Sequence, residues 1–152
     1  MEVGLRIGSL YAGGSHLSFS GDVGINTLEG INCVLEIFGS LSINSADFTD
    51  CNIIINSGAL LSISSTSIVR GSISGNGQML STDISLEDVD ISCTMSAYSS
   101  TLSGVTTFHS STYITTNATV LPGATLLSIE STILIPELNL EDDASFLMMS
   151  GT

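Results

Sequence analysis

Residues 47–63 read DFTDCNIIINSGALLSI, and residues 67–82 read SIVRGSISGNGQMLST with a similar rhythm. The segment INSADFTDCNI at residues 43–53 matches ISSTSIVRGSI at residues 63–73 position by position, so apolar and polar residues recur at a constant offset. A unit this short cannot bury its own apolar face, whereas stacked units bury one continuous core. The repeat therefore predicts a solenoid.

Further copies of the unit extend along the chain. Gly39, Gly58 and Gly77 are evenly spaced, and each precedes an apolar-rich segment. GATLLSI begins at residue 123 and DASFLMM at residue 143, and INTLEGINC (25–33) and LEDVDI (86–91) are looser copies. About seven coils of 19–20 residues fit into the chain, with glycines expected where the chain turns a corner.

The repeated unit consists of short strands. The chain is dense in Ser, Thr, Ile, Val, Gly and Asn, and apolar residues alternate with polar ones, as in LSI at residues 41–43 and 61–63. We therefore expect an all-β fold, a single-stranded parallel β-helix (β-solenoid), with alternate side chains pointing inward. The expected interior ladder is Leu41, Ile43, Phe48, Ile53, Leu61, Ile63, Ile68, Ile73, Leu80, Leu86, Val89 and Ile91.

At 152 residues the chain fits one domain, residues 1–152. Within it, residues 1–24 alternate like a strand and are expected to be an irregular or edge-pairing N-terminal segment. Residues 101–119 break the rhythm and predict an irregular coil or loop, where a specific binding surface is most expected.

The charge of the chain excludes several partners. It carries 15 acidic residues against Arg6 and Arg70, with no lysine, for a net charge of −13. Such a surface cannot neutralise phosphates, so we expect no nucleic-acid partner. Apolar runs are too short to span a bilayer, so we expect no membrane insertion.

The segments FTDCNI (48–53), IVRGSI (68–73) and LEDVDI (86–91) resemble coils of right-handed parallel β-helices of the pectin-lyase-like superfamily. TVLPGATLLSI (119–129) resembles coils of secreted adhesins and autotransporter passenger domains. The resemblance lies in the coil pattern. It implies the fold, a right-handed winding, and an extracellular or cell-surface location, and it carries over no active site.

Many members of that superfamily cleave acidic polysaccharides with paired carboxylates, or with an arginine and bound calcium. The carboxylates that could form such a catalytic pair, or a weak calcium site, are Glu87, Asp88, Asp90, Glu141, Asp142 and Asp143. A polyanionic substrate needs cations, and only Arg70 lies on the central coils. We therefore interpret these carboxylates as solvated turns and expect no enzymatic activity, no catalytic residues and no cofactor.

Other chemistry is sparse. His109 is followed by Ser110 and Ser111, but adjacent side chains of a strand point to opposite faces, and no carboxylate completes a triad. Cys33 and Cys51 lie in similar positions of successive coils and are expected to stack. They are either buried free thiols or a disulfide, and the sequence leaves both open.

The sequence favours a structural role. A solenoid exposes an unpaired strand edge at each end, and uncapped edges invite pairing. We expect a non-enzymatic extracellular fibre, surface or adhesin module that self-associates end to end, with a surface glycan as a further partner. The alternatives are a polysaccharide-binding or -cleaving β-helix and an ice-binding solenoid. Ice binding needs a regular hydroxyl ladder, for which the pairs at residues 106–107 and 115–116 have no copy between Gly39 and Gly77.

Overall fold

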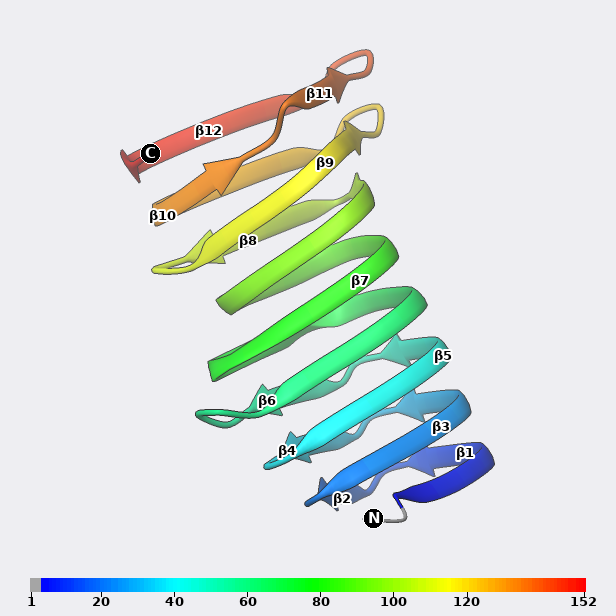
Figure 1. Ribbon diagram of the computed structural model, residues 1–152. Coiled ribbons are helices and arrows are strands. Elements are labelled where there is room, and N and C mark those ends of the chain that lie inside the picture. Colours follow the sequence, from blue (N-terminus) through cyan, green and yellow to red (C-terminus); the bar gives the residue numbers. More distant parts are fainter. Residues whose placement is uncertain (1–3) are drawn as a thin grey trace.

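The computed structural model describes residues 4–152, which form one parallel β-solenoid of about eight turns (Figure 1). All twelve strands belong to a single sheet, and every strand pairing between them is parallel. The strands are β1 (Leu5–Gly13), β2 (His16–Phe19), β3 (Asp22–Ile31), β4 (Val34–Ile37), β5 (Ser40–Thr49), β6 (Asn52–Ile55), β7 (Leu60–Ser103), β8 (Val105–His109), β9 (Thr112–Val120), β10 (Thr125–Leu134), β11 (Glu137–Leu140) and β12 (Ser145–Gly151). The expected all-β solenoid is confirmed, with about eight coils instead of about seven.

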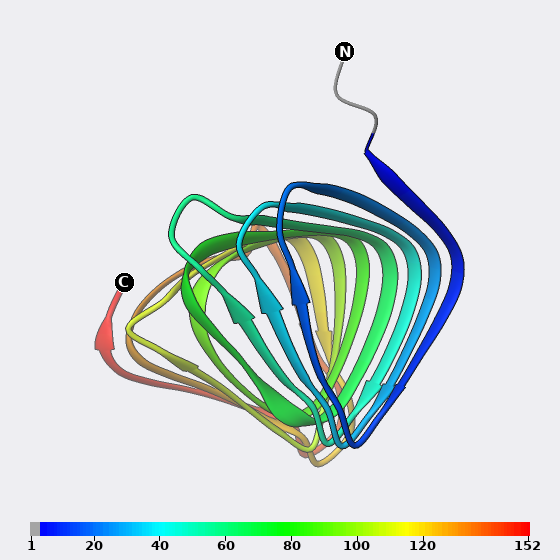
Figure 2. The ribbon, with the colours of Figure 1, turned by 90° about the horizontal axis from the view of Figure 1, so that it is seen from below.

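The strands form two stacks that share one interior. One stack runs β1–β3–β5–β7–β9–β11, and the other runs β2–β4–β6–β7–β8–β10–β12. Seen along the axis, each coil bends around a three-sided interior (Figure 2). No helix long and apolar enough to cross a bilayer occurs in residues 4–152. Strand pairing is the same for either hand of the coil, so the hand expected from the resemblance stays a prediction.

The register confirms the repeat in the centre of the chain. Ile43 pairs with Ile63, Phe48 with Ile68, and Ile53 with Ile73. Earlier coils are slightly shorter, because Ile25 pairs with Ile43 in the step from β3 to β5. The coil length therefore changes along the rod. The constant spacing of Gly39, Gly58 and Gly77 in the sequence lies between the lengths of the longer and the shorter coils.

A second change in coil length shows that one residue of the expected interior ladder was predicted wrongly. The amide of Gln78 donates to the carbonyl of Ala59, which places Gln78 over Leu60, again with a shorter coil. Met79 is therefore the residue over Leu61, and it is fully buried, whereas Leu80 is 41% exposed. A register change of one residue moves a side chain to the opposite face. The other eleven residues of the expected ladder are buried.

The two segments that the sequence sets apart, residues 1–24 and 101–119, contain strands. Of residues 1–24, residues 1–3 lie outside the described part, and β1 and β2 pair with β3 and β4. Residues 101–119 include the end of β7, β8 and most of β9, and the coil between β7 and β8 is shorter still, since Asp90 pairs with Thr107. Gly104 and Ser110 in this segment have positive φ angles of 60° and 45°.

The interior changes character along the axis. Its N-terminal part is mainly aliphatic, as at Leu35, Ile53 and Ile73, none of which is exposed. The C-terminal part contains stacked rings of Phe108 and Tyr113, with centroids 4.4 Å apart. Burial raises the pKa of Tyr113 to about 12. This part also contains buried hydroxyl groups, from Ser100, Thr106, Thr107, Ser111, Thr115, Ser128 and Ser131.

One corner of the coil is turned by residues in the left-handed conformation. It begins at Gly14 and continues through Asn32, Asp50, Arg70 and Asp88, whose φ angles lie between 50° and 58°. Asn and Asp tolerate this conformation better than other non-glycine residues, which explains two of the three non-glycine residue types here. The expectation that glycine turns each corner therefore holds here only at Gly14.

Candidate functional site

The N-terminal end of the rod exposes a half-covered core. β1 and β2 each have one neighbouring strand, β3 and β4, and no second neighbour among residues 4–152. Ile7, Leu10 and Leu17 pair with fully or almost fully buried residues of the next coil, so their side chains have the inward orientation. They are only partly buried. We call these three residues the N-terminal end face.

The C-terminal end repeats this arrangement. β11 pairs with β9, and β12 with β10, and the described residues include no strand beyond them. Leu140 pairs with Val120, Phe146 with Leu126 and Met148 with Ser128, and all three partners are fully buried. Leu140 and Met148 are nevertheless 45% and 44% exposed, because no coil covers them. We call Leu140, Phe146 and Met148 the C-terminal end face.

Neither edge carries the usual protection against pairing. Natural edge strands are blunted by lysines, prolines, bulges or inward-pointing charges. The chain has no lysine, β12 (SFLMMSG) has no charged residue, and β11 (ELNL) has one. β1 contains Arg6 as its only charged residue, and no proline lies within any of the four edge strands. Within residues 4–152, these four strands therefore each leave one backbone edge without a parallel neighbour.

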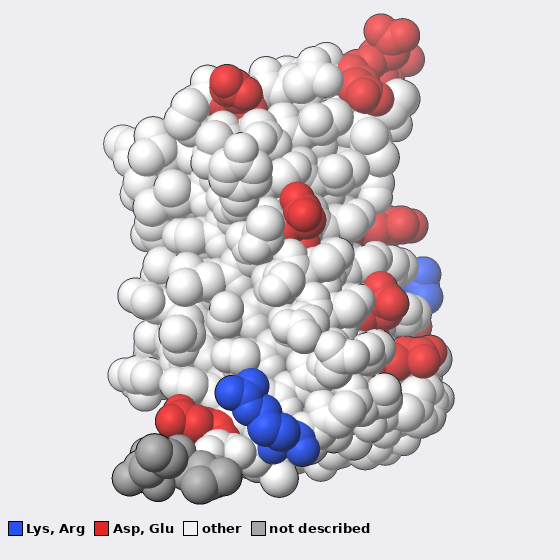
Figure 3. All heavy atoms as spheres, turned by 45° about the vertical axis from the view of Figure 1, so that its right-hand side comes forward, with Lys and Arg blue, Asp and Glu red and all other residues white. Residues whose placement is uncertain are grey.

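The acidic residues do not converge on a site. In Figure 3 the carboxylates are scattered over the visible surface and gather toward the right-hand side and the upper end. Within the described part of the chain, no three His, Cys, Asp or Glu side chains approach closely enough to hold a metal ion. Glu87, Asp88 and Asp90 are exposed along β7. Residues 141–143 form the exposed turn between β11 and β12, closed by a bond from the amide of Ala144 to the carbonyl of Glu141.

Two of the exposed carboxylates have structural partners. The amide of Val105 donates to Oδ1 of Asp88 at 2.8 Å, so this carboxylate caps the chain on the next coil. Arg70 donates to Asp50 through Nε at 2.9 Å and through Nη2 at 3.1 Å. This bidentate bond lowers the pKa of Asp50. The only arginine on the central coils is thus already paired with a carboxylate of the coil below.

The histidines do not form a catalytic group with the nearby serines. His109 is exposed on β8, whereas Ser111 is buried with its Oγ 3.2 Å from Oγ of Ser131. His16 lies at the surface with Nε2 3.2 Å from Oε2 of Glu36. No hydroxyl–imidazole–carboxylate set is assembled by these residues.

A column of threonines follows the rod outside its C-terminal half. Thr94 pairs with Thr112, which pairs with Thr132, and the hydroxyls of Thr132 and Thr152 lie 3.5 Å apart. Thr112 is half-buried and the other three are exposed. The coil spacing makes this column readable in the sequence, but the sequence-based expectation missed it. That expectation considered the pairs at residues 106–107 and 115–116, and there Thr106, Thr107 and Thr115 are buried in the core.

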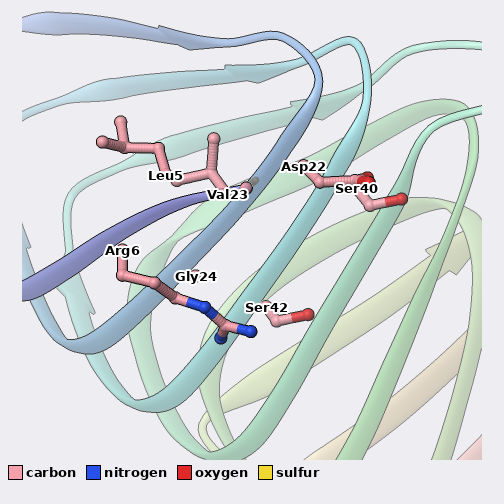
Figure 4. A pocket seen from close by; sticks show the side chains of 8 residues that line it. Leu5, Arg6, Asp22, Val23, Gly24, Ser40 and Ser42 are labelled. Atoms are coloured by element: carbon pink, nitrogen blue, oxygen red, sulfur yellow. The ribbon is translucent and has the colours of Figure 1, made fainter. Parts of the chain in front are cut away.

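A shallow groove crosses the outer surface of the first coils (Figure 4). Its two adjoining parts have volumes of about 180 and 300 Å³, and Arg6 and Gly24 line both. Arg6 lies over Gly24, where a Cβ atom would stand 2.6 Å from Nη1. The other lining groups include Asp22, Ser42 and Asn44. They suit a polar ligand such as a glycan, but they are exposed and no aromatic ring lines the groove, so it is a weaker candidate than the end faces.

No family model, curated protein or solved structure matches the chain. The function is therefore inferred from the geometry of the two end faces.

Proposed function

We propose that the protein is a non-enzymatic structural β-solenoid, a module of an extracellular or cell-surface fibre or adhesin, that associates end to end with further copies of itself. The observation that carries this proposal is the pair of open, apolar strand edges at opposite ends of one parallel stack, where the charge at the C-terminal end is confined to Glu137 and the turn of residues 141–143. An extracellular position is inferred from the resemblance of the coils to secreted adhesins.

The two ends are complementary because all pairings are parallel. The C-terminal end offers β11 from one stack and β12 from the other, and the N-terminal end offers β1 and β2 from the same two stacks. A second copy placed head to tail would add β1 beyond β11 and β2 beyond β12, continuing the coil. Such a contact uses different surfaces on the two copies and does not close on itself, so it generates a filament.

Burial of the end faces supplies the driving force. Leu140, Phe146 and Met148 would be covered by a coil carrying Ile7, Leu10 and Leu17. Burial of apolar surface stabilises a contact by about 25 cal/mol for each Å² removed from water. Opposing it, a net charge of −13 makes copies repel one another, and salt screens this repulsion. Association should therefore rise with both protein concentration and ionic strength.

Sedimentation velocity and negative-stain electron microscopy over a series of salt concentrations test the proposal. We expect elongated assemblies whose length grows with salt, with an axial repeat equal to the length of one rod. Met148→Asp places a charge on the C-terminal end face and should abolish the growth. Leu80→Asp is the matched control, because Leu80 is 41% exposed but lies on the side of the rod, and it should assemble like the parent.

Two results would overturn the proposal. Monodisperse particles of one chain at every salt and protein concentration would show that the edges do not pair. Equal loss of assembly in Leu80→Asp and Met148→Asp would show that copies associate through their sides.

The threonine column supports a second candidate function, ice binding. Threonine hydroxyls and methyls repeat along the rod at the strand spacing of about 4.8 Å, at residues 94, 112, 132 and 152. Thermal hysteresis at micromolar protein tests it. Thr132→Tyr, which inserts a bulky ring into the column, should reduce the effect, and Leu80→Tyr should leave it unchanged. No hysteresis in the parent protein would eliminate this candidate.

A further inference from the structure

Two cysteines on successive coils meet inside the rod. Cys33 and Cys51 are 2% and 0% exposed, and their Sγ atoms lie 2.7 Å apart. They occupy the same position on their coils, just after the left-handed corner residues Asn32 and Asp50. A disulfide bond has an S–S length of about 2.05 Å, so the two sulfur atoms need only a small movement to bond.

Backbone hydrogen bonds hold this pair in register. The amide of Asn32 donates to the carbonyl of Thr49 at 3.0 Å, and the amide of Asn52 donates to the carbonyl of Cys33 at 2.9 Å. Neighbouring positions on adjacent strands lie about 4.8 Å apart. The flanking hydrogen bonds continue the pairing through the corner, and the strand spacing falls within the range of about 4.4–6.8 Å between the Cα atoms of bridged cysteines, so the coil spacing suits a bridge.

The sulfur atoms occupy space that a glycine leaves open. A Cβ atom on Gly30 would stand 2.8 Å from Sγ of Cys33, 3.2 Å from Sγ of Cys51 and 2.8 Å from a ring carbon of Phe48. Any side chain at residue 30 would therefore compete with the two sulfurs for the same volume. The third cysteine, Cys93, is buried on a later coil and has no sulfur partner in the described part of the chain.

We infer that Cys33 and Cys51 are a redox pair that closes into a disulfide between successive coils, bridging the corner of the rod near its N-terminal end. The oxidant is a small-molecule disulfide. In the first step a protein thiolate attacks it, forming a mixed disulfide and releasing one small thiol. In the second, the other protein cysteine displaces the second small thiol, so two S–H bonds are exchanged for one protein S–S bond.

The folded rod resists this reaction until its coils open. Both sulfurs are shielded from solvent, and burial together with the hydrogen bond to Cys51 raises the pKa of Cys33 to about 12. Because the thiolate is the attacking species, little of it forms at neutral pH in the closed coil. Oxidation should therefore accompany folding, or follow transient opening of the corner, and the bridge once formed should be equally resistant to reductants.

The test is to refold the full chain from denaturant in a glutathione redox buffer and then to unfold it in denaturant that contains an excess of alkylating agent, so that buried free thiols also react. We expect one alkylated cysteine per chain, Cys93, after oxidising refolding, and three after reducing refolding. Trypsin cannot separate the pair, because it cleaves after Lys and Arg and the chain has only Arg6 and Arg70. A protease that cleaves after Glu and Asp has sites between the cysteines, at Glu36, Asp47 and Asp50, and the two peptides should stay linked until reduced.

Three variants make the result specific. Cys93→Ser should keep the bridge and leave no alkylated cysteine after oxidising refolding. Cys33→Ser and Cys51→Ser should give no linked peptides. The oxidised parent should melt at a higher temperature than the reduced parent, and neither variant should show this difference. Three free thiols in the refolded parent under oxidising conditions, or a linkage that involves Cys93, would overturn the inference.

Discussion

Ile63 lies directly over Ile43 in the parallel register of β5 and β7, and the two side chains are 1% and 2% exposed. The same position is occupied by Ile25 and Ile7 on the two coils below. This column of isoleucines is one edge of the continuous interior, so its members support one another along the axis. A change in the middle of the column affects the coils on both sides.

Ile63→Asp should abolish cooperative unfolding of the rod, because it buries an unpaired charge between two coils. We expect a loss of more than about 4 kcal/mol, which is a large fraction of the stability of an ordinary domain. Thermal melts followed by circular dichroism measure this. Ser42→Asp, next to the same column but facing solvent, is the control and should melt like the parent. A melt of Ile63→Asp near that of the parent would contradict the interior position.

The sequence predicted the central coils well because they repeat with one step. The match of residues 43–53 to residues 63–73 identified Ile63, Ile68 and Ile73 as stacked interior positions, and the register confirms each one. The prediction failed at Leu80, where the coil becomes shorter. Alternation alone cannot reveal such a change, because a slip of one residue gives an equally regular pattern with the faces exchanged.

The candidate site was predictable only in outline. Open edges follow from any uncapped solenoid, but the end faces depend on which coil is outermost and on which residues of that coil point inward. Thr106 and Thr115 show the same limit for polar residues: both belong to the threonine pairs that a surface ladder would have needed, and both are buried. Side-chain direction there depends on the shortened step at β8, which no local pattern indicates.

Gly71→Ala should destabilise the rod through a close approach of two coils. A Cβ atom at residue 71 would lie 2.3 Å from the carbonyl oxygen of Cys51, a backbone atom that cannot turn away. Overpacking of this kind costs about 1–3 kcal/mol, and we expect the upper part of that range. Urea unfolding measures the change. Gly8→Ala is the control, because nothing lies within 4 Å of its added Cβ, and its stability should stay within about 0.5 kcal/mol of the parent.

Thr106→Val should stabilise the protein. Thr106 is fully buried beneath Leu126, and its hydroxyl has no hydrogen-bond partner among the described residues. Valine has nearly the same shape without the polar group, so the cost of keeping an unpaired hydroxyl away from water disappears, a gain of about 1 kcal/mol. Chemical denaturation should show a higher midpoint with an unchanged slope. Thr94→Val on the exposed column is the control, and a loss of stability in Thr106→Val would mean that the hydroxyl is satisfied.

The ion pair between Asp50 and Arg70 should make a small contribution to stability that depends on pH. The hydrogen bond and charge of Arg70 lower the pKa of Asp50 in the folded protein. A carboxyl group with a lowered pKa stabilises the fold fully above its unfolded pKa, about 3.9, and this contribution is lost as pH falls through the lower folded value. Because both side chains are at the surface, the effect should be modest and should shrink with salt. The difference in melting midpoint between the parent and Arg70→Gln should be constant from neutral pH down to about pH 5 and should vanish in stronger acid. Arg6→Gln is the control, because it removes the same charge at a position where the described residues include no carboxylate in salt-bridge contact, and it should show no such transition. A pH-independent difference for Arg70→Gln would mean that the Arg70 side chain stabilises the corner by packing alone.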